Sequence, residues 1–410
     1  MSEWKKVKLG DCCEITSSKR IFLSDYVPVG IPFYRSKEIA EMQKGNTISD
    51  PLFISNDKYE EIKCKFGVPH KGDLLLTAIG ATLGIPFVIK NDLPFYFKDG
   101  NLIWFKNFNN LLDPSFLYTW MCSNFGYQSM QNIAIGSAQK ALTISALKDL
   151  SILVPPFDVQ QHIATILSRY DSLIENYQKQ IKLLEEAAQR LYKEWFVDLR
   201  FPGHENTKIV DGVPEGWEKK TINDICTHIS SGSTPSRRNK SYWENGTIKW
   251  IKTKELLDGW IFDTEEYITD DGLKNSSTKI YPVNSILMAI YASPTLGRLG
   301  ILASECCCNQ AALCLIANEQ IVSWQWLYWK LFELRDEFNS IARGAGQQNI
   351  SGIVVKNKEV LVPTRQVIDA FTNIANPIFQ KIKKTSYQIH LLTEARDRLL
   401  PKLMSGEITV

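Results

Sequence analysis

Hydrophobic and polar residues alternate along most of this chain in short runs, which are interrupted by two long stretches with a helical repeat. The runs FVIK (87–90), LIWF (102–105) and LCLIA (313–317) are rich in β-branched and aromatic residues, which is typical of buried strands. The stretches SFLYTWMCSNFGYQSM (115–130) and SWQWLYWKLFELRDEF (323–338) are amphipathic and indicate helices. We therefore expect two globular parts that both belong to the α+β class.

The first long stretch has apolar residues spaced alternately four and three positions apart, as in the seam of a coiled-coil helix. These positions are Ile163, Leu167, Tyr170, Ile174, Tyr177, Ile181, Leu184, Ala188, Leu191 and Trp195. Adding 208 to each number gives Phe371, Ala375, Ile378, Ile382, Thr385, Ile389, Leu392, Arg396, Leu399 and Leu403. The second series is interrupted by Thr385 and Arg396, and Pro377 predicts a kink near the start of its helix.

The same offset joins the segments that precede the two helices, so the chain is an internal repeat. GSAQKALTISALKDLSILVPP (136–156) aligns without a gap to GAGQQNISGIVVKNKEVLVPT (344–364), an offset of 208 residues (344 − 136). Earlier, IPFYRSKEI (31–39) parallels IKWIKTKEL (248–256), and GDLLLTAIGATLG (72–84) parallels NSILMAIYASPTLG (284–297). The linker RFPGHENTKIVDGVPEGW (200–217) has no periodicity and separates the two copies.

The repeat predicts four segments in order along the chain. They are a first globular domain (1–155), a first helix (156–199), a second globular domain (200–363) and a second helix with a short tail (364–410). Two apolar stripes in one chain can bury each other. We therefore expect the helices to pair as an antiparallel coiled coil, with the two domains related by a pseudo-twofold axis.

Composition places the chain among ordinary globular proteins. It has 47 basic and 45 acidic residues, 44% hydrophobic residues and 11% aromatic residues, which does not suit a disordered protein. No apolar run reaches the roughly 18 residues of a membrane helix, and the charged start MSEWKKVKLG does not resemble a secretory signal. Nine cysteines, some of them adjacent, indicate free buried thiols in a reducing compartment. We expect a cytoplasmic protein.

Sequence motifs of enzymes are not found in the chain. It contains no GxxxxGK[ST] or GxGxxG string for a nucleotide and no HExxH or CxxC pair for a metal. Asp50 with Glu61 and Lys63 could mimic a nuclease, and Asn376-Pro377-Ile378-Phe379 could mimic the base-gripping loop of an aminomethyltransferase. Neither has support elsewhere in the chain. We therefore predict no catalytic residue, no metal site and no bound cofactor.

Basic residues cluster locally and lie beside aromatic residues at matching places in the two copies. The first copy has Lys19-Arg20 and Arg35-x-Lys37, and the second has Arg237-Arg238-x-Lys240 with Lys252 and Lys254. Basic side chains among aromatic ones can contact phosphates and base edges of a nucleic acid. Solvated loops with ordinary lysines are the alternative interpretation, and the net charge of +2 favours it.

Two polar, glycine-containing loops are the second candidate. They carry Gln139 and Lys140 in the first copy, and Gln347 and Gln348 in the second. Glutamine can form two hydrogen bonds with a base edge, and glycine allows the backbone to come close. A tight connection whose side chains cap the next segment explains the same loops equally well.

Several stretches resemble the specificity (S) subunit of type I restriction-modification systems. They are LVPPFDVQQHIATIL (153–167), LYKEWFVDLRFPGHE (191–205), VPEGWEKKTI (213–222), SGSTPSRRNKSYWENGTIKWIKTKEL (231–256) and LLPKLMSGEITV (399–410). The chain departs from the family where Gln160-Gln161 replaces an acidic residue followed by glutamine. The second copy also lacks the double proline, which leaves the start of each helix open.

This resemblance implies a non-catalytic subunit that reads a bipartite DNA sequence with one domain per half-site. It implies partners as well: double-stranded DNA, two adenine-methyltransferase (M) subunits and ATP-dependent restriction (R) subunits. S-adenosylmethionine, ATP and magnesium would then be bound by the partners. The residues that the resemblance assigns to DNA contact are Arg20, Arg35, Lys37, Gln139, Thr234, Arg237, Arg238, Lys254 and Gln347.

Two other functions stay open at this point. One is a coiled-coil scaffold that joins two protein-binding modules, for which the near-neutral charge would be natural. The other is a specificity module of a related system in which recognition and methylation are fused, although the chain has no cofactor-binding motif.

Overall fold

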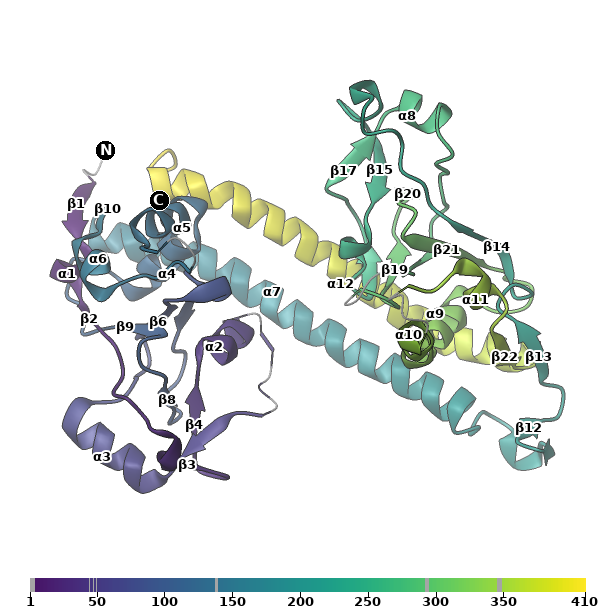
Figure 1. Ribbon diagram of the computed structural model, residues 1–410, viewed down its shortest axis with the longest axis horizontal. Coiled ribbons are helices and arrows are strands. Elements are labelled where there is room, and N and C mark those ends of the chain that lie inside the picture. The colour runs from purple at the N-terminus through teal and green to yellow at the C-terminus, as the bar shows by residue number, and fades with distance from the viewer. Residues whose placement is uncertain are drawn as a thin grey trace. The chain divides into compact units, whose positions relative to one another are not determined.

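The computed structural model describes residues 4–43, 45, 46, 48, 50–136, 139–291, 295–344 and 349–410. Two long helices, α7 (Phe157–Tyr192) and α12 (Arg365–Ser405), run through it (Figure 1). The chain forms two units, Met1–Glu175 with Leu392–Val410, and Asn176–Leu391. Each unit therefore contains a segment of both helices.

The first unit contains three small sheets, ordered β1-β10, β2-β9-β6-β7 and β3-β5-β4-β8. Its strands are β1 (Lys5–Lys8), β2 (Glu14–Thr16), β3 (Tyr26–Val27), β4 (Ile31–Tyr34), β5 (Leu52–Ile54), β6 (Leu74–Thr77), β7 (Pro86–Val88), β8 (Tyr96–Phe97), β9 (Leu102–Lys106) and β10 (Ser151–Val154). Its shorter helices are α1 (Leu9–Cys12), α2 (Ser36–Gln43), α3 (Asn56–Phe66), α4 (Pro114–Cys122), α5 (Asn124–Ile133) and α6 (Ile144–Asp149).

The second unit has sheets ordered β13-β22, β14-β21-β18-β19-β16, β17-β15-β20 and β11-β12. Its strands are β11 (Ile209–Val210), β12 (Val213–Pro214), β13 (Glu218–Thr221), β14 (Cys226–Ser231), β15 (Ile248–Ile251), β16 (Gly259–Ile261), β17 (Glu266–Ile268), β18 (Ile286–Ala289), β19 (Leu299–Leu302), β20 (Cys307–Cys308), β21 (Ala312–Ala317) and β22 (Glu359–Val362). Its shorter helices are α8 (Asp270–Lys274), α9 (Trp324–Glu333), α10 (Arg335–Gly344) and α11 (Gly352–Lys356).

The internal repeat is visible in the strand order of the two units. The order β2-β9-β6-β7 of the first unit matches β14-β21-β18-β19 of the second, and the pair β1-β10 matches β13-β22. The parallel pair β4 and β8 likewise corresponds to β15 and β20. Both units mix helices and strands, which confirms the predicted α+β class.

The predicted seam of each long helix faces inward, since none of its ten positions is exposed in either helix. In the first unit, Ile163 and Leu167 of α7 share a hydrophobic core with Leu403 of α12. There the side chain of Arg396 on α12 also forms an ion pair with Asp171 on α7, at 2.8 Å. Coiled-coil pairing over the whole length of the helices stays a prediction.

In the second unit, aromatic side chains join the end of α7 to the start of α12. The helix α7 continues into a π-helical turn, Lys193–Val197, which buries Trp195 and Phe196. The ring of Phe371 on α12 lies 5.0 Å from that of Phe196 and 6.3 Å from that of Tyr192, measured between centroids. Stacked and edge-on aromatic pairs of this kind stabilise a core beyond their buried area.

Both long helices begin at equivalent residues, because Phe157 and Arg365 are 208 positions apart (365 − 157). Loss of the double proline in the second copy therefore does not move the start of the helix. The second helix also continues through Pro377 without a break in its helical assignment.

Gln160, at one of the departures from the family pattern, is buried at the start of α7. Its Oε1 accepts a hydrogen bond from the backbone N–H of Asp113 at 2.9 Å. Its Nε2 donates to the carbonyl oxygens of Leu111 and Pro155, both at 2.9 Å. The side chain thus fixes the segment before α4 to the start of the long helix.

Replacing Gln160 by alanine is expected to lower the free energy of unfolding by about 1–3 kcal/mol, because buried backbone groups would lose their partners. Urea denaturation of the whole chain measures this change. Gln161→Ala is the matched control, since Gln161 is exposed on the same helical turn and should cost less than about 0.5 kcal/mol. Equal losses in the two variants would contradict the role assigned to Gln160.

The consecutive cysteines of the second unit are buried, as predicted, and they serve packing. Cys306 and Cys308 belong to one hydrophobic cluster and Cys307 to another, as alternation along a strand requires. Burial raises the pKa of Cys307 to about 12. Cys64 and Cys122 are exposed, so the expectation of buried thiols is wrong for these two.

Within the described residues, no group of three or more histidine, cysteine or acidic side chains is arranged to hold a metal ion. In the same part of the chain, no helix has the length and apolarity needed to cross a bilayer.

Candidate nucleic-acid interface

The first candidate region is the turn that follows β4 in the first unit and β15 in the second. In both turns the backbone N–H of the first basic residue donates a hydrogen bond to the side chain of a glutamate that lies three residues later in the sequence. The distances are 2.8 Å from Arg35 to Glu38 and 2.6 Å from Lys252 to Glu255. The repeated basic-x-Lys-Glu sequence therefore encodes a capped turn. This structural role explains part of the repeated basic pattern without any contact to a nucleic acid.

In the first unit this turn holds Arg35 and leaves Lys37 exposed. Arg35 donates Nε and Nη2 hydrogen bonds to both carboxylate oxygens of Glu38, at 3.2 and 2.6 Å. Burial works to raise the pKa of Glu38, but the hydrogen bonds from Arg35 outweigh it and lower the pKa. The side chain of Arg35 is thus paired with Glu38 of the same turn, whereas the Lys37 side chain is exposed to solvent.

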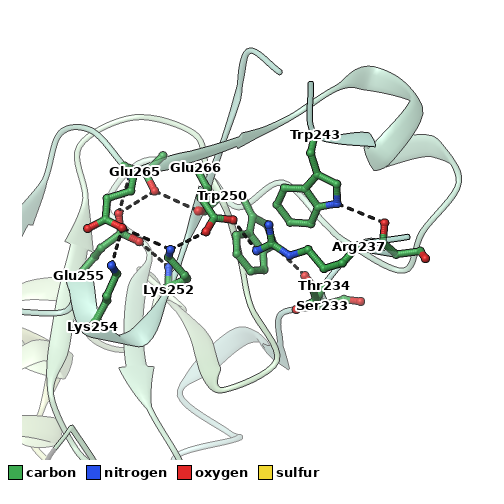
Figure 2. A network of polar contacts seen from close by, with 12 residues as sticks. Ser233, Thr234, Arg237, Trp243, Trp250, Lys252, Lys254, Glu255, Glu265 and Glu266 are labelled. Carbon is green, nitrogen blue, oxygen red and sulfur yellow. Dashed lines mark hydrogen bonds and ion pairs between the residues drawn. The ribbon is translucent and has the colours of Figure 1, made fainter. Parts of the chain in front are cut away.

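In the second unit two adjacent acidic residues, Glu265 and Glu266, lie against the basic residues of the turn (Figure 2). Lys252 is 2.5 Å from Glu266 and 3.3 Å from Glu265, and Lys254 is 2.5 Å from Glu265. Hydrogen bonds from Lys254 and then Lys252 lower the pKa of Glu265. The basic cluster predicted here is therefore compensated by carboxylates within the same unit.

The pairing of carboxylates with these basic residues depends on how the strands β15 and β17 are aligned. Glu266 lies on β17, which pairs antiparallel with β15 and brings Glu266 opposite Trp250. The sequence TEEY shows two acidic residues but not the strand that they face.

Arg237 lies beside this cluster, on the loop between β14 and β15. Its Cζ atom is 3.5 Å from the ring centroid of Trp243 and 5.0 Å from that of Trp250. The Nη2 group also forms an ion pair with Glu266. Figure 2 shows the guanidinium between the two indole rings and the carboxylate. The structure thus brings Arg237, Lys252 and Lys254 together, as the sequence analysis expected.

The other predicted residues of this loop differ in their surroundings. Thr234 donates its hydroxyl hydrogen bond to the side chain of Gln310, so this donor is already used. Lys240 is exposed and lies 3.9 Å from Glu244. Arg238 is exposed, and no ion pair or hydrogen bond of its side chain is found within the described residues.

The equivalent loop of the first unit also places cations on aromatic rings. The Nζ atom of Lys19 is 4.7 Å from the ring centroid of Phe66, and the Cζ atom of Arg20 is 5.6 Å from that of Phe22. The backbone N–H of Lys19 donates to the hydroxyl of Tyr96 at 2.7 Å.

The second candidate region consists of two neighbouring loops in each unit. Backbone hydrogen bonds connect the two loops. In the first unit the N–H of Leu142 donates to the carbonyl of Ala78, and in the second the N–H of Ile350 donates to that of Ile290, both at 2.9 Å. The loop with Gln139 and Lys140 is thus held beside the glycine-rich turn after β6. Gln347 and Gln348 lie outside the described residues.

These loops of the first unit border an open hollow of about 610 Å³. It is lined by Gly80, Ala81, Leu83, Tyr127, Gln131, Gln139 and Lys140. Gly80 has a φ of +80°, and the amide nitrogen of Gln139 lies close to where a Cβ would stand, so glycine suits this position. The sequence analysis missed Tyr127 and Gln131, which α5 contributes; an exposed tyrosine on an amphipathic helix was the available signal.

The sequence matches the family model of the type I restriction modification DNA specificity domain over residues 1–186 and again over residues 214–391. The chain belongs to this family. The two matched ranges correspond to the two copies of the internal repeat, so the specificity domain is present twice.

Named members of the specificity family are similar to the chain over its full length. It is 27% identical over 420 residues to the type I restriction enzyme MjaIX specificity subunit of Methanocaldococcus jannaschii, covering 100% of the chain and 94% of that relative. It is 25% identical over 475 residues to the HindI specificity subunit of Haemophilus influenzae, covering 100% of both. The relatives are thus specificity subunits of type I restriction enzymes.

A solved structure supports the fold of this specificity chain. The type I restriction-modification S subunit from M. genitalium matches with a TM-score of 0.64 at 18% identity, covering 98% of the chain and 96% of that structure. At this level of identity the match shows a common fold.

Proposed function

We propose that this chain is the DNA-specificity subunit of a type I restriction-modification complex and performs no catalysis itself. The observation that carries the proposal is the duplication. Two equivalent sheets, two equivalent loop pairs and two long helices occur in one chain that matches the specificity domain twice. A duplicated reader fits a target made of two separate half-sites.

Each domain would read one half-site with its own loops. In the first domain the contact residues proposed are Arg20, Arg35, Lys37, Gln139 and Lys140. In the second they are Thr234, Arg237, Arg238, Lys240, Lys254, Gln347 and Gln348. Arg35 and Thr234 already use donors on partners within the chain, so Arg35 would contact DNA with its remaining N–H groups and Thr234 with its oxygen as an acceptor.

The long helices would set the distance between the half-sites as an antiparallel coiled coil. Contacts inside each unit support this pairing. In the first unit Asp171 in the first half of α7 meets Arg396 near the end of α12. In the second, Tyr192 at the end of α7 meets Phe371 near the start of α12. Both contacts are consistent with two helices that run in opposite directions.

Two methyltransferase subunits and the restriction subunits would dock on this chain, and they would bind S-adenosylmethionine, ATP and magnesium. Large apolar side chains that stay exposed on the long helices support docking. They are Leu173, Leu183, Ile374 and Leu391, each at least 44% exposed. These side chains offer apolar contacts to a partner subunit.

The direct test is to purify the chain with its methyltransferase subunit and map methylated adenines in DNA. We expect N6-adenine methylation at a split sequence only when this chain is present. Unchanged methylation after the chain is left out would refute the proposal.

A scaffold joining two protein-binding modules is the alternative, and charge favours it. The net charge is +2, and the carboxylates of Glu265 and Glu266 pair with the three cations Arg237, Lys252 and Lys254. A scaffold would leave methylation unchanged in the same experiment.

A further inference from the structure

We propose that Arg237 reads a guanine in the half-site of the second domain, and that Trp243, Trp250 and Glu266 position its guanidinium for this contact. This inference rests on the proposed function, because it names the base and the residues that the second domain would use.

The backbone that carries Arg237 is fixed at both ends. The carbonyl of Ser236 accepts a hydrogen bond from the N–H of Asn239 at 3.2 Å, which places Arg237 and Arg238 at the centre of a tight turn. The N–H of Ser233, just before the turn, donates to the carbonyl of Cys308 at 2.9 Å. The turn is therefore attached to the buried strand β20.

The two indole rings are anchored to the same loop. The Nε1–H of Trp243 donates to the carbonyl of Ser236 at 3.2 Å, and that of Trp250 donates to the carbonyl of Ser233 at 2.9 Å. The ring centroids are 5.0 Å apart at an interplanar angle of 88°. A free arginine side chain loses rotamer entropy when a ligand orders it, so a side chain already held by these rings binds at a lower entropic cost.

Arg237 is held but keeps donors for a ligand. A guanidinium has five N–H groups, and the described partner of Arg237 is Glu266, bound through Nη2. Its side chain is 51% exposed. Arg335, by contrast, donates from Nε, Nη1 and Nη2 to Gly297 and Asp258 and is 21% exposed. Within the described residues, the Nε and Nη1 groups of Arg237 form no hydrogen bond.

The local charge favours a base over a phosphate as the partner of Arg237. Glu265 and Glu266 pair with the three cations of the cluster, and Glu255 adds a third carboxylate at the backbone N–H of Lys252, so the cluster attracts a phosphate only weakly (Figure 2). The hydrogen bonds that directed N–H donors form with a base do not require a net positive charge. Arginine most often recognises guanine, by donating two hydrogen bonds to O6 and N7 in the major groove. The neighbouring Arg238 is exposed and has no ion pair among the residues that the structure describes, so it suits a phosphate.

Methylation mapping with the intact complex of this chain and its methyltransferase subunit tests the inference. With the unchanged chain, we expect guanine to be required at one position of the second half-site. Arg237→Ala should reduce the preference for guanine at that position by about 5- to 150-fold and leave every other position unaltered. Arg237→Lys, which keeps the charge but not the paired donors, should lose most of the same preference.

Arg238→Ala is the control for a phosphate contact and should weaken methylation of all sequences alike. Guanine preference that survives in Arg237→Ala, or a uniform loss in that variant, would overturn the inference while the split target still supports the proposed function. If the unchanged chain directs no split target, the proposed function itself fails.

The positioning role of Glu266 has its own matched pair of variants. Glu266→Gln should lower guanine preference at the same single position, because Nη2 loses its charged acceptor. Glu265→Gln should leave that preference unchanged, since Glu265 pairs with Lys252 and Lys254 and not with Arg237. Equal effects of the two variants would show that the acidic pair acts only on local charge.

Synthetic duplexes with 7-deazaguanine at that position give a second readout, because this base lacks the N7 acceptor. They should bind the unchanged complex more weakly than guanine duplexes, and Arg237→Ala should abolish the difference. A difference that persists in Arg237→Ala would assign N7 recognition to another residue.

Discussion

Exchanging residues 201–363 for the second domain of another family member is expected to change one half of the methylated sequence and leave the other half unaltered. The exchanged range contains the proposed second-domain contacts on the loop 233–240 and the turn with Lys254. The contacts proposed for the first domain lie outside the range. Mapping of methylated adenines before and after the exchange measures both halves in one experiment.

The exchange also has to preserve the packing of the second domain on the long helices. Trp326 of α9 and Phe371 of α12 belong to one hydrophobic core, together with Tyr192 of α7. The donor domain should therefore carry apolar residues at the position of Trp326. Exchange of residues 1–155 is the reciprocal control and should change only the other half. A change in both halves after either exchange would refute one reader per domain.

Inserting seven residues into each long helix is expected to lengthen the gap between the half-sites by about 3 base pairs. Seven residues add roughly 10 Å to a helix at about 1.5 Å per residue, and each base pair occupies about 3.4 Å along DNA. Suitable places are after Glu175 in α7 and after Leu391 in α12, where the chain divides between its two units. A heptad keeps the seam on the same face of each helix.

The control inserts the heptad into α7 alone. Because only one of two paired helices would then be lengthened, we expect misaligned seams and a loss of methylation. The half-site sequences themselves should stay the same in the double insertion. An unaltered gap in that variant would contradict the role of the helices as a spacer.

Much of the fold could be predicted because it is repeated and periodic. The 208-residue offset separates the starts of α7 and α12, and the seam positions are shielded in both helices, including Thr385 and Arg396. Local periodicity and a second copy are both visible in a sequence. Packing partners distant in the chain are not, so the residues of the first domain that share a core with Leu403 were not anticipated.

The candidate site was predicted in its basic residues but not in what surrounds them. The cluster of Lys252, Lys254 and Arg237 was expected from aligned sequence positions. The carboxylates that compensate it depend on the antiparallel register of β15 and β17, which sequence patterns leave open. The stacking of Arg237 on Trp243 depends on the turn at Ser236, which the sequence indicated only by the closeness of the two residues.

The shared core of the first unit has a consequence for how the protein is made. Leu167 and Leu403 are both buried there, although 236 residues separate them (403 − 167). A ribosome that adds about 5–20 residues per second needs roughly 12–47 s to cross that interval. The first domain therefore leaves the ribosome early but completes its core only after Leu403 has been added. During this time its apolar surface is available to chaperones, and a nascent chain that stops before α12 would keep that surface exposed.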